Sequence, residues 1–244
     1  MSSAGRRTPR HRAEQMRPAT TSQHDALSRR SVLVIATRNP GKLREYAALF
    51  ADSPVVLRDL AGFPAAPEVA EDHTTYLGNA RDKALSLARF TGLPALADDS
   101  GLEVDALDGE PGVRSARYAG NGATDHDNVA LLLERLRGVP VERRQARFRC
   151  VIVVAQPSGA LLTSEGTCEG WITTEPRGCA GFGYDPVFYF PPAGRTFAEM
   201  EPDEKNRVSH RASACERLAP LLSAFLRRSM TGGQQAVRVR NVSP

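Results

Sequence analysis

The sequence contains little that a membrane-embedded or secreted protein needs. No apolar run in its 244 residues approaches the roughly 18 residues of a membrane-spanning helix. The first 30 residues are rich in arginine but lack the apolar stretch of a secretory signal. Hydrophobic residues make up 41% of the chain and charged residues 25%, which is typical of a globular domain with a real core. We therefore expect a cytoplasmic protein that does not contact a membrane.

Cysteine is also scarce, and its spacing excludes two classes of protein. The four cysteines are Cys150, Cys168, Cys179 and Cys215, with no C-x-x-C pairing among them. This pattern fits neither a zinc site nor the disulfide framework of a small secreted domain. We expect four reduced thiols, which agrees with a cytoplasmic location.

Excess positive charge is absent from the central part of the chain. The net charge is +4, but residues 1–30 alone carry seven arginines against two acidic residues. The remaining residues are therefore slightly acidic, and more so without Arg238 and Arg240 near the end. A nucleic-acid-binding domain needs a basic surface, so we expect no nucleic-acid partner for this region. Residues 1–30 lack hydrophobic periodicity and are predicted to be a disordered basic extension.

The central region, 31–228, is predicted to be a single folded domain, followed by a flexible tail at 229–244. Apolar runs predict buried strands, and apolar residues at three-to-four spacing predict helices. The predicted strands are 31–36, 54–57, 94–97, 102–106, 148–155 and 161–171. The predicted helices are 42–50, 75–90, one that opens at Thr124, and 206–227. The last two strands are joined by Pro-Ser-Gly and form a hairpin, so the pattern predicts an α/β protein with a mixed sheet.

The most informative segment contains two adjacent aspartates. Asp98 and Asp99 follow the apolar run 93–97 and precede Ser100 and Gly101, so we predict that a buried strand ends there in a polar turn. Negative charge beside apolar protein is costly unless a cation compensates it. A divalent metal bound together with a phosphate substrate would supply that cation. An exposed Asp-rich turn is the simpler alternative.

Residues 37–42, Thr-Arg-Asn-Pro-Gly-Lys, lie between a predicted strand and a predicted helix. The free N–H groups and partial positive charge of a helix amino terminus favour phosphate. Gly41 would let the backbone approach closely, and Lys42 adds a positive charge. The segment does not match the G-x-x-x-x-G-K-[ST] phosphate loop. It could also be an ordinary turn with a solvated lysine.

Two later segments could contact the rest of a nucleotide. In 181–186, Phe182 stands between two glycines and could stack on a base, although it could equally fold back into the core. Lys205 and the segment 209–211 could donate to a phosphate or a purine carbonyl. The alternative for these residues is a solvated, charged start of a helix.

Several blocks occur in one order along the chain: 36–42, 79–84, 97–107, 111–120, 181–186 and 198–211. Together they cover roughly 31–228, and this region resembles the inosine triphosphate pyrophosphatase family, in its bacterial dITP/XTP pyrophosphatase branch. The resemblance implies an elongated α/β fold: a long mixed β-sheet flanked by helices, in two lobes with a central nucleotide cleft. It also implies a homodimer that uses Mg²⁺ to hydrolyse ITP, dITP and XTP to the monophosphate and pyrophosphate, which cleanses the nucleotide pool.

The resemblance also implies roles for individual residues. Asp99 corresponds to the catalytic proton acceptor and metal ligand, and Asp98 is a second candidate for the metal. His210 and Arg211 could donate to the 6-oxo group of hypoxanthine or xanthine, whereas the amino group of adenine would leave those donors unpaired. The implied substrate-binding residues are Thr37, Arg38, Asn39, Pro40, Gly41, Lys42, Ser100, Phe182, Gly183, Tyr184, Asp185, Lys205, His210 and Arg211.

The chain departs from the family pattern at Gly78. The family usually has a glutamate immediately before the pair Asn79-Ala80, where it helps to bind the metal, and glycine has no side chain to replace it. Our hypothesis is that the enzyme is active but needs more Mg²⁺. Two alternatives remain open: a related pyrophosphatase with another base preference, such as a modified pyrimidine, and a nucleotide-binding or nucleic-acid-associated protein that has lost catalysis.

Overall fold

The computed structural model describes residues 31–228 and 237–238; the predicted extension, 1–30, and the rest of the predicted tail, 229–236 and 239–244, lie outside the described residues. The strands are β1 (Ser31–Ile35), β2 (Val55–Arg58), β3 (Ala95–Val104), β4 (Gln145–Ala155), β5 (Leu161–Ile172), β6 (Phe188–Phe190), β7 (Arg195–Thr196) and β8 (Val237–Arg238). The helices are α2 (Pro40–Leu49), α3 (Tyr76–Thr91), α4 (Asp125–Arg135), α5 (Pro202–Val208) and α6 (His210–Arg228). Short 3₁₀ segments connect several of these elements.

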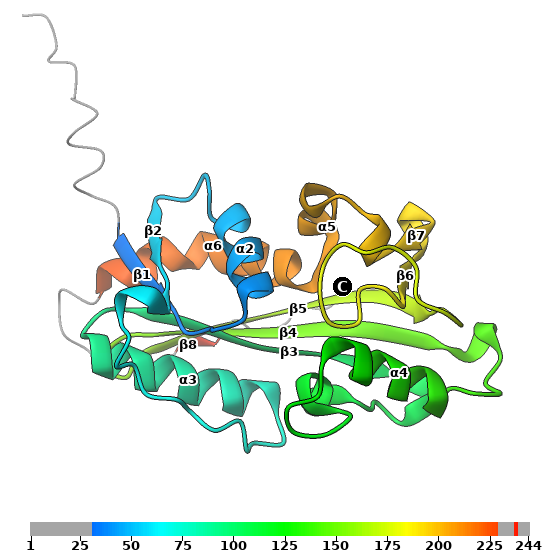
Figure 1. Cartoon of the computed structure of the whole chain (residues 1–244). Coiled ribbons are helices and arrows are strands. Elements are labelled where there is room, and N and C mark those ends of the chain that lie inside the picture. The colour runs from blue at the N-terminus through cyan, green and yellow to red at the C-terminus, as the bar shows by residue number, and fades with distance from the viewer. Residues whose placement is uncertain (1–30, 229–236, 239–244) are drawn as a thin grey trace, which may run out of the picture. The chain divides into compact units, whose positions relative to one another are not determined.

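All the strands belong to one mixed sheet (Figure 1), in the order β2-β1-β3-β4-β5-β6-β7, with β8 paired to β5. Strand β1 runs parallel to both β2 and β3, because helices α2 and α3 carry the chain back between these strands. Strands β3, β4 and β5 are antiparallel neighbours, and the predicted hairpin joins β4 to β5. The predicted α/β class with a mixed sheet is confirmed.

Helices cover both faces of this sheet. Figure 1 shows α3 below the long strands and α2 and α6 above them. Ala80 and Ala84 of α3 pack against Ala97 of β3, while Leu218 of α6 packs against Ile152 of β4. Successive side chains along a strand point to opposite faces, so one strand supplies both cores. Toward the other end of the sheet, a third apolar cluster joins α4 to β3, β6 and the segment after β7.

The predicted turn at Asp98 and Asp99 is wrong, because β3 continues through both residues. In the antiparallel register Asp98 lies opposite Ile152 and Asp99 opposite Val151, so the pair sits in the middle of a ten-residue strand. The polar side chains are tolerated there because cationic and amide groups from other elements bind them, as described below. The strand ends at Val104, and Ala106 belongs to a short 3₁₀ segment instead of a second strand.

The single predicted helix at 206–227 is also wrong, because the structure has two helices there. Ser209 has an extended backbone between α5 and α6, and its hydroxyl oxygen accepts from the backbone N–H of Ala212 at 3.2 Å. Serine favours this arrangement at the start of a helix. Lys205 therefore lies on α5, whereas His210 and Arg211 open α6. The short strands β6 and β7, and β8 within the predicted tail, were not expected from the sequence.

None of the helices in the described ranges is long and apolar enough to cross a lipid bilayer. All four cysteines are unpaired, and Cys179 is the exposed one.

Candidate active site

A cavity of about 410 Å³ lies at the carboxyl end of β1. Strand β1 pairs with β3 only at Val34 with Ala95 and Ile35 with Leu96, after which the two strands separate. The chain leaves β1 toward α2 on one face and reaches β3 from α3 on the other. Such a point in an α/β sheet leaves a crevice at the carboxyl ends of the strands, where ligands commonly bind.

The structure brings most of the predicted site residues to this one cavity, although they span 175 positions of the sequence from 37 to 211. Pro40, Gly41 and Asp98 are exceptions that do not line it: Pro40 is exposed, whereas Gly41 and Asp98 are buried. The predicted residues that line the cavity are Thr37, Arg38, Asn39, Lys42, Asp99, Ser100, Phe182, Gly183, Tyr184, Asp185, Lys205, His210 and Arg211.

Asn39 and Pro40 set the amino terminus of α2. The Asn39 side chain accepts from the backbone N–H groups of Gly41, at 2.8 Å, and Lys42, at 3.1 Å. Pro40 occupies the first helical turn, where its missing N–H costs no hydrogen bond. The helix therefore starts two residues before the predicted 42–50. Its positive end faces the cavity, beside the Lys42 amine, which is a suitable arrangement for an anion.

Arg38 is directed differently from its neighbours in 37–42. Its guanidinium donates to the backbone oxygen of Ala66 at 3.3 Å and pairs with Glu68 at 3.5 Å. Both partners belong to the loop between β2 and α3. Arg38 thus lines the cavity and also holds one of its walls.

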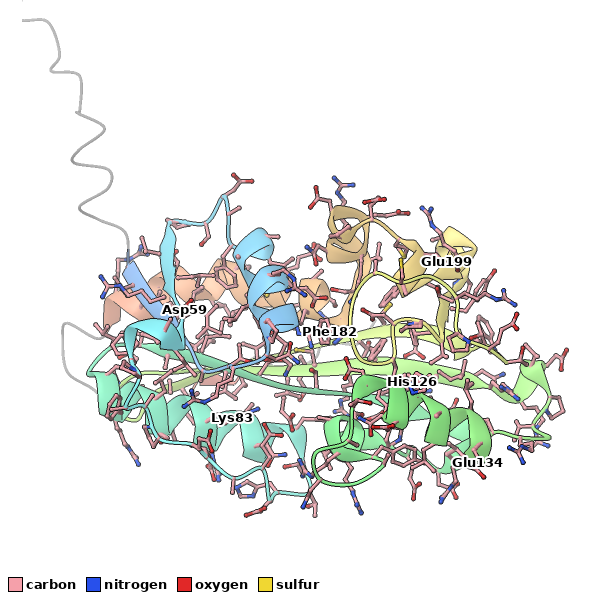
Figure 2. All side chains as sticks on the ribbon, viewed as in Figure 1. Asp59, Lys83, His126, Glu134, Phe182 and Glu199 are labelled. Carbon is pink, nitrogen blue, oxygen red and sulfur yellow. The ribbon has the colours of Figure 1, made fainter. Side chains whose placement is uncertain are left out.

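Gly41 is needed for a reason that differs from the predicted close approach to phosphate. A Cβ atom at this position would overlap the Phe182 ring, so the aromatic side chain packs directly on the start of α2 (Figure 2). The Lys205 amine lies 4.9 Å from the centre of the same ring, and the Arg211 guanidinium 5.4 Å. These contacts hold Phe182 as a wall of the cavity, with its position fixed by cation–π attraction and by the absence of a side chain at Gly41.

We expect Gly41→Ala to displace the Phe182 ring and to raise KM for a purine nucleotide by about 3- to 10-fold, since a cation–π contact contributes about 0.5–2 kcal/mol. The turnover number should change less, because the acidic and cationic groups that line the cavity remain in place. Steady-state kinetics would measure KM and the turnover number separately. Gly62→Ala is the matched control, because a Cβ at Gly62 meets no other atom within 4 Å. An unchanged KM in Gly41→Ala would contradict this role for the glycine.

Asp98 belongs to a buried ionic cluster beside the cavity. Its Oδ2 atom pairs with the Lys42 amine at 2.8 Å and with Nε of Arg211 at 3.4 Å, and accepts from the Ser100 hydroxyl at 3.2 Å. Burial alone would raise the pKa of Asp98, but the charges of Lys42 and Arg211 outweigh it and hold the pKa below its ordinary value. Asp98 is therefore an ionised group that anchors two cations.

Glu45, on α2, extends this cluster and was missed by the sequence analysis. Its carboxylate binds Nη1 of Arg211 at 2.5 Å and the Lys205 amine at 2.8 Å. Lys205 also binds Asp185, whose Oδ2 atom accepts from the backbone N–H of Phe182 at 2.9 Å. Burial would raise the pKa of Glu45, and the two cations lower it overall. Glu45 thus connects helix α2 with the cations on α5 and α6.

Asp99 points to the other side of β3, as alternation along a strand requires. Its Oδ2 atom accepts from Nδ2 of Asn79 at 2.8 Å, and its Oδ1 atom accepts from the backbone N–H of Ser100 at 3.0 Å. Burial raises the pKa of Asp99, and the nearby Lys83 charge and the Asn79 hydrogen bond oppose that rise only in part. A carboxylate with a raised pKa that faces a cavity is suited to accept a proton.

Lys83 and Glu71 also face the cavity and were not predicted as site residues. The Lys83 amine donates to the backbone oxygen of Asp98 at 2.7 Å and to the Glu71 carboxylate at 2.9 Å (Lys83 is labelled in Figure 2). The sequence held a signal for Lys83, since it follows Asn79 by one helical turn and so shares its face of α3. It held none for Glu71, which lies in an irregular loop and reaches the site only through tertiary contacts.

His210 is a neutral ring within the site. It is 3% exposed, stacks on Phe148 with ring centres 4.7 Å apart, and its Nδ1 atom has no hydrogen-bond partner among the described residues. Burial, with the charges of Arg211 and Lys205, lowers the pKa of His210 well below its ordinary value. A neutral imidazole carries one donor and one acceptor, so the ring can form a directed hydrogen bond with a ligand.

Gly78 does not line the cavity. A Cβ atom there would lie 2.7 Å from Cγ of His73, whose ring pairs with Asp82 at 2.7 Å. Gly78 and Asp82 are one turn apart on α3. Asn79 and Lys83 are one position further on, where Asn79 binds Asp99 and Lys83 lines the cavity. A carboxylate at position 78 would therefore face His73 and Asp82, which argues against the hypothesis that this glycine weakens the binding of Mg²⁺.

We accordingly expect the Mg²⁺ requirement of the Gly78→Glu enzyme to be no lower than that of the Gly78→Ala enzyme. Both variants displace His73, but only the first adds a carboxylate, so the pair isolates the effect of the charge. The measurement is the Mg²⁺ concentration that gives half the maximal rate. A requirement several-fold lower in Gly78→Glu than in Gly78→Ala would restore the original hypothesis.

The donor groups fit a divalent ion that arrives with phosphate. Among the described residues, no three His, Cys, Asp or Glu side chains gather where they could hold a metal ion. Asp99 and Glu71 face the same cavity, whereas Asp98 lies behind it with Oδ2 engaged by Lys42 and Arg211. Mg²⁺ needs only one or two carboxylates when substrate phosphates and water complete its shell, so Asp99 and Glu71 suffice.

Comparison with known proteins agrees with this geometry. A family model described as the Ham1 family matches residues 33–221. A dITP/XTP pyrophosphatase from Geobacillus kaustophilus is 54% identical over 186 residues, covering 76% of this chain and 91% of the relative. One from Syntrophobacter fumaroxidans is 58% identical over 184 residues, covering 75% of this chain and 78% of the relative.

Solved structures give the same result for the fold. A HAM1 protein from Coxiella burnetii is 43% identical, with a TM-score of 0.72, and the match covers 80% of this chain and 99% of that one. A nucleoside-triphosphatase, also titled dITP/XTP pyrophosphatase, from Mycobacterium abscessus is 42% identical, with a TM-score of 0.63, over 78% of this chain and 99% of that one. The matched family region includes every residue that lines the cavity, and the resemblance inferred from the sequence is confirmed. The chain belongs to the Ham1 family.

Proposed function

We propose that the protein hydrolyses the non-standard purine nucleoside triphosphates ITP, dITP and XTP to the monophosphate and pyrophosphate. The observation that carries this proposal is the convergence on one cavity of a carboxylate with a raised pKa, Asp99, with the cations Lys42 and Lys83. The names of its relatives support the same activity. The reaction would remove such nucleotides from the nucleotide pool.

The triphosphate would lie at the amino terminus of α2. Thr37, Asn39 and Lys42 line that end of the cavity, and Lys83 approaches from α3. A triphosphate carries about four negative charges, so the attack of water depends mainly on neutralising and positioning the phosphates. The helix terminus and the two lysines supply fixed positive charge for that purpose. Pro40 and Gly41 shape the helix start without facing the cavity.

Asp99 is proposed to accept the proton of the attacking water. Its raised pKa brings the group closer to the working pH, where a general base is most effective. Asp99 and Glu71 would hold Mg²⁺ together with the phosphates, and the bound ion would neutralise phosphate charge. Asn79 and the backbone N–H of Ser100 keep the Asp99 carboxylate in its orientation.

The base would pack against Phe182 at the other end of the cavity. His210 has a ring nitrogen, Nδ1, without a partner among the described residues, and when protonated this nitrogen could donate a hydrogen bond to a 6-oxo group. Arg211 contacts Glu45, Asp98 and Ser100, so it would support this donor mainly through position and charge. Adenine presents an amino group in place of the oxygen, which would leave the His210 donor unpaired, and a buried unpaired donor is a strong basis for rejection.

We further propose that residues 31–228 form the catalytic domain and that the protein acts in the cytoplasm as a homodimer. The family match over 33–221 supports the domain, the four unpaired thiols agree with a reducing compartment, and the dimer is implied by the family resemblance. Light scattering on the full chain would measure the oligomeric state. If turnover is unchanged after deletion of residues 1–30, the hypothesis that this segment serves as a nucleic-acid contact would lose its support.

The experiment that tests the function is product analysis with ITP, XTP, GTP, ATP and dTTP in the presence of Mg²⁺. Pyrophosphate and monophosphate from ITP and XTP, with little product from the other three, is the expected result. Preferred turnover of a pyrimidine nucleotide would assign another base preference. No turnover of any nucleotide, even at high Mg²⁺, would indicate a binding protein instead of an enzyme.

A further inference from the structure

Arg117 has no assigned role, although it lies in one of the sequence blocks that the chain shares with its family. It ends the 3₁₀ segment Gly112–Arg117, between β3 and α4. Its Nη2 atom donates to the backbone oxygen of Glu71 at 2.6 Å, and its Nη1 atom lies 3.6 Å from the Glu71 carboxylate. Arg117 does not line the cavity itself, so any effect on the site passes through Glu71.

Glu71 is fixed from two directions by these contacts. Arg117 holds its backbone oxygen and one carboxylate oxygen, Oε2, while Lys83 binds the other, Oε1, at 2.9 Å. Lys83 is itself anchored on the backbone of Asp98, next to Asp99. The carboxylate therefore cannot rotate freely, although the loop that carries it has no regular structure between the 3₁₀ segment Leu60–Gly62 and α3.

An exposed ion pair usually contributes little, and Arg117 is 30% exposed. The hydrogen bond from Arg117 to the backbone oxygen of Glu71 distinguishes this contact from such a pair. It fixes the course of the loop at Glu71, whose side chain faces the cavity. A second bond holds the same loop two residues later, where the backbone N–H of His73 donates to Asn79 at 3.0 Å. Asn79 also binds Asp99, so both cavity carboxylates depend on one short stretch of loop.

We propose that Arg117 is a positioning residue that holds Glu71 opposite Asp99, so that a divalent ion bound with the nucleotide phosphates meets both carboxylates. This inference rests on the proposed function, because it assigns Arg117 to the metal side of that site. Groups that orient a metal ligand in this way typically affect metal affinity by about 10- to 100-fold.

The test compares Arg117→Gln with Arg114→Gln, an exposed arginine three residues earlier on the same 3₁₀ segment. We expect Arg117→Gln to raise the Mg²⁺ concentration for half-maximal ITP hydrolysis by about tenfold or more. The rate at saturating Mg²⁺ should remain near that of the wild type, and Arg117→Lys should recover part of the effect. In the metal-free protein, hydrogen exchange of the amides in 66–75 should become faster in Arg117→Gln and stay unchanged in Arg114→Gln.

The inference is overturned if the Mg²⁺ requirement of Arg117→Gln equals that of Arg114→Gln, even where exchange in 66–75 is faster, since Arg117 would then only stabilise the loop. It is equally overturned if exchange does not change. A wild-type protein without turnover would defeat the proposed function instead, and the exchange comparison would still decide whether Arg117 holds the Glu71 loop.

Discussion

Asp99→Asn should lower kcat/KM for ITP by about 10³-fold while the protein stays folded, within the roughly 10²- to 10⁴-fold range of general acid–base catalysis. The asparagine keeps nearly the same shape and can still accept from the backbone N–H of Ser100, but it cannot take up a proton. Burial already opposes the charge of Asp99, so losing that charge should cost little stability beyond the hydrogen bond from Asn79, about 1 kcal/mol. Steady-state kinetics and the melting temperature measure the two effects.

The surface variant Asp52→Asn serves as the control, because Asp52 is exposed and does not line the cavity. It should match the wild type in both measurements. A kcat/KM for Asp99→Asn within tenfold of the wild type would remove Asp99 as the proton acceptor. Asp98 would not replace it, since the two cations that it binds hold its pKa low.

Glu45→Ala should lower the free energy of unfolding by about 3–5 kcal/mol, the usual consequence of removing one partner from a buried charge pair. Glu45 is 8% exposed, and its loss leaves Arg211 with Asp98 and Lys205 with Asp185 as their remaining carboxylates. Discrimination between ITP and the standard purine nucleotides should fall as well, because both cations hold the Phe182 ring. Denaturant unfolding and the ratio of kcat/KM values measure these effects.

The effect of Glu45→Ala on stability should depend on pH in a defined direction. The pKa of Glu45 is lowered in the folded protein, so its contribution is present above the pKa of an unfolded glutamate and is lost as the pH falls through the folded value. The difference in the free energy of unfolding between Glu45→Ala and the wild type should therefore become smaller at acidic pH. Glu216→Ala, an exposed position on α6, should change stability by no more than about 0.5 kcal/mol at either pH. Equal effects of the two variants at neutral pH would contradict a stabilising role for the buried cluster.

Local patterns in the sequence were sufficient to predict much of this protein's structure. Turn residues placed the βα junction at 37–42, and the order of the motif blocks identified the family and most of the cavity lining. Capping chemistry is local too: Thr124 caps α4, the helix predicted to open at that residue, and Thr75 caps α3. Such features depend on neighbouring residues, which a sequence displays directly.

The conformation of the adjacent residues Asp98 and Asp99 could not be predicted in the same way, because it depends on partners that are distant in the sequence. Asp98 and Asp99 were assigned to a turn, as two carboxylates normally would be. Pairing with β4 keeps them within a strand, where alternation sends one to Lys42 and Arg211 and the other to Asn79 and the cavity. The different roles of the two aspartates therefore follow from strand register, which nothing in their local sequence reveals.

The sequence by itself determined the fold class, the family and the residue types of the site, because hydrophobic periodicity and motif order are properties of the chain. Only the tertiary structure decided which groups meet: Glu45 with Lys205 and Arg211, Glu71 with Lys83 and Arg117, and Gly78 with His73. These contacts join segments from different elements or orient a loop without regular structure. Their geometry is set by how the helices pack on the sheet, and the local sequence does not encode it.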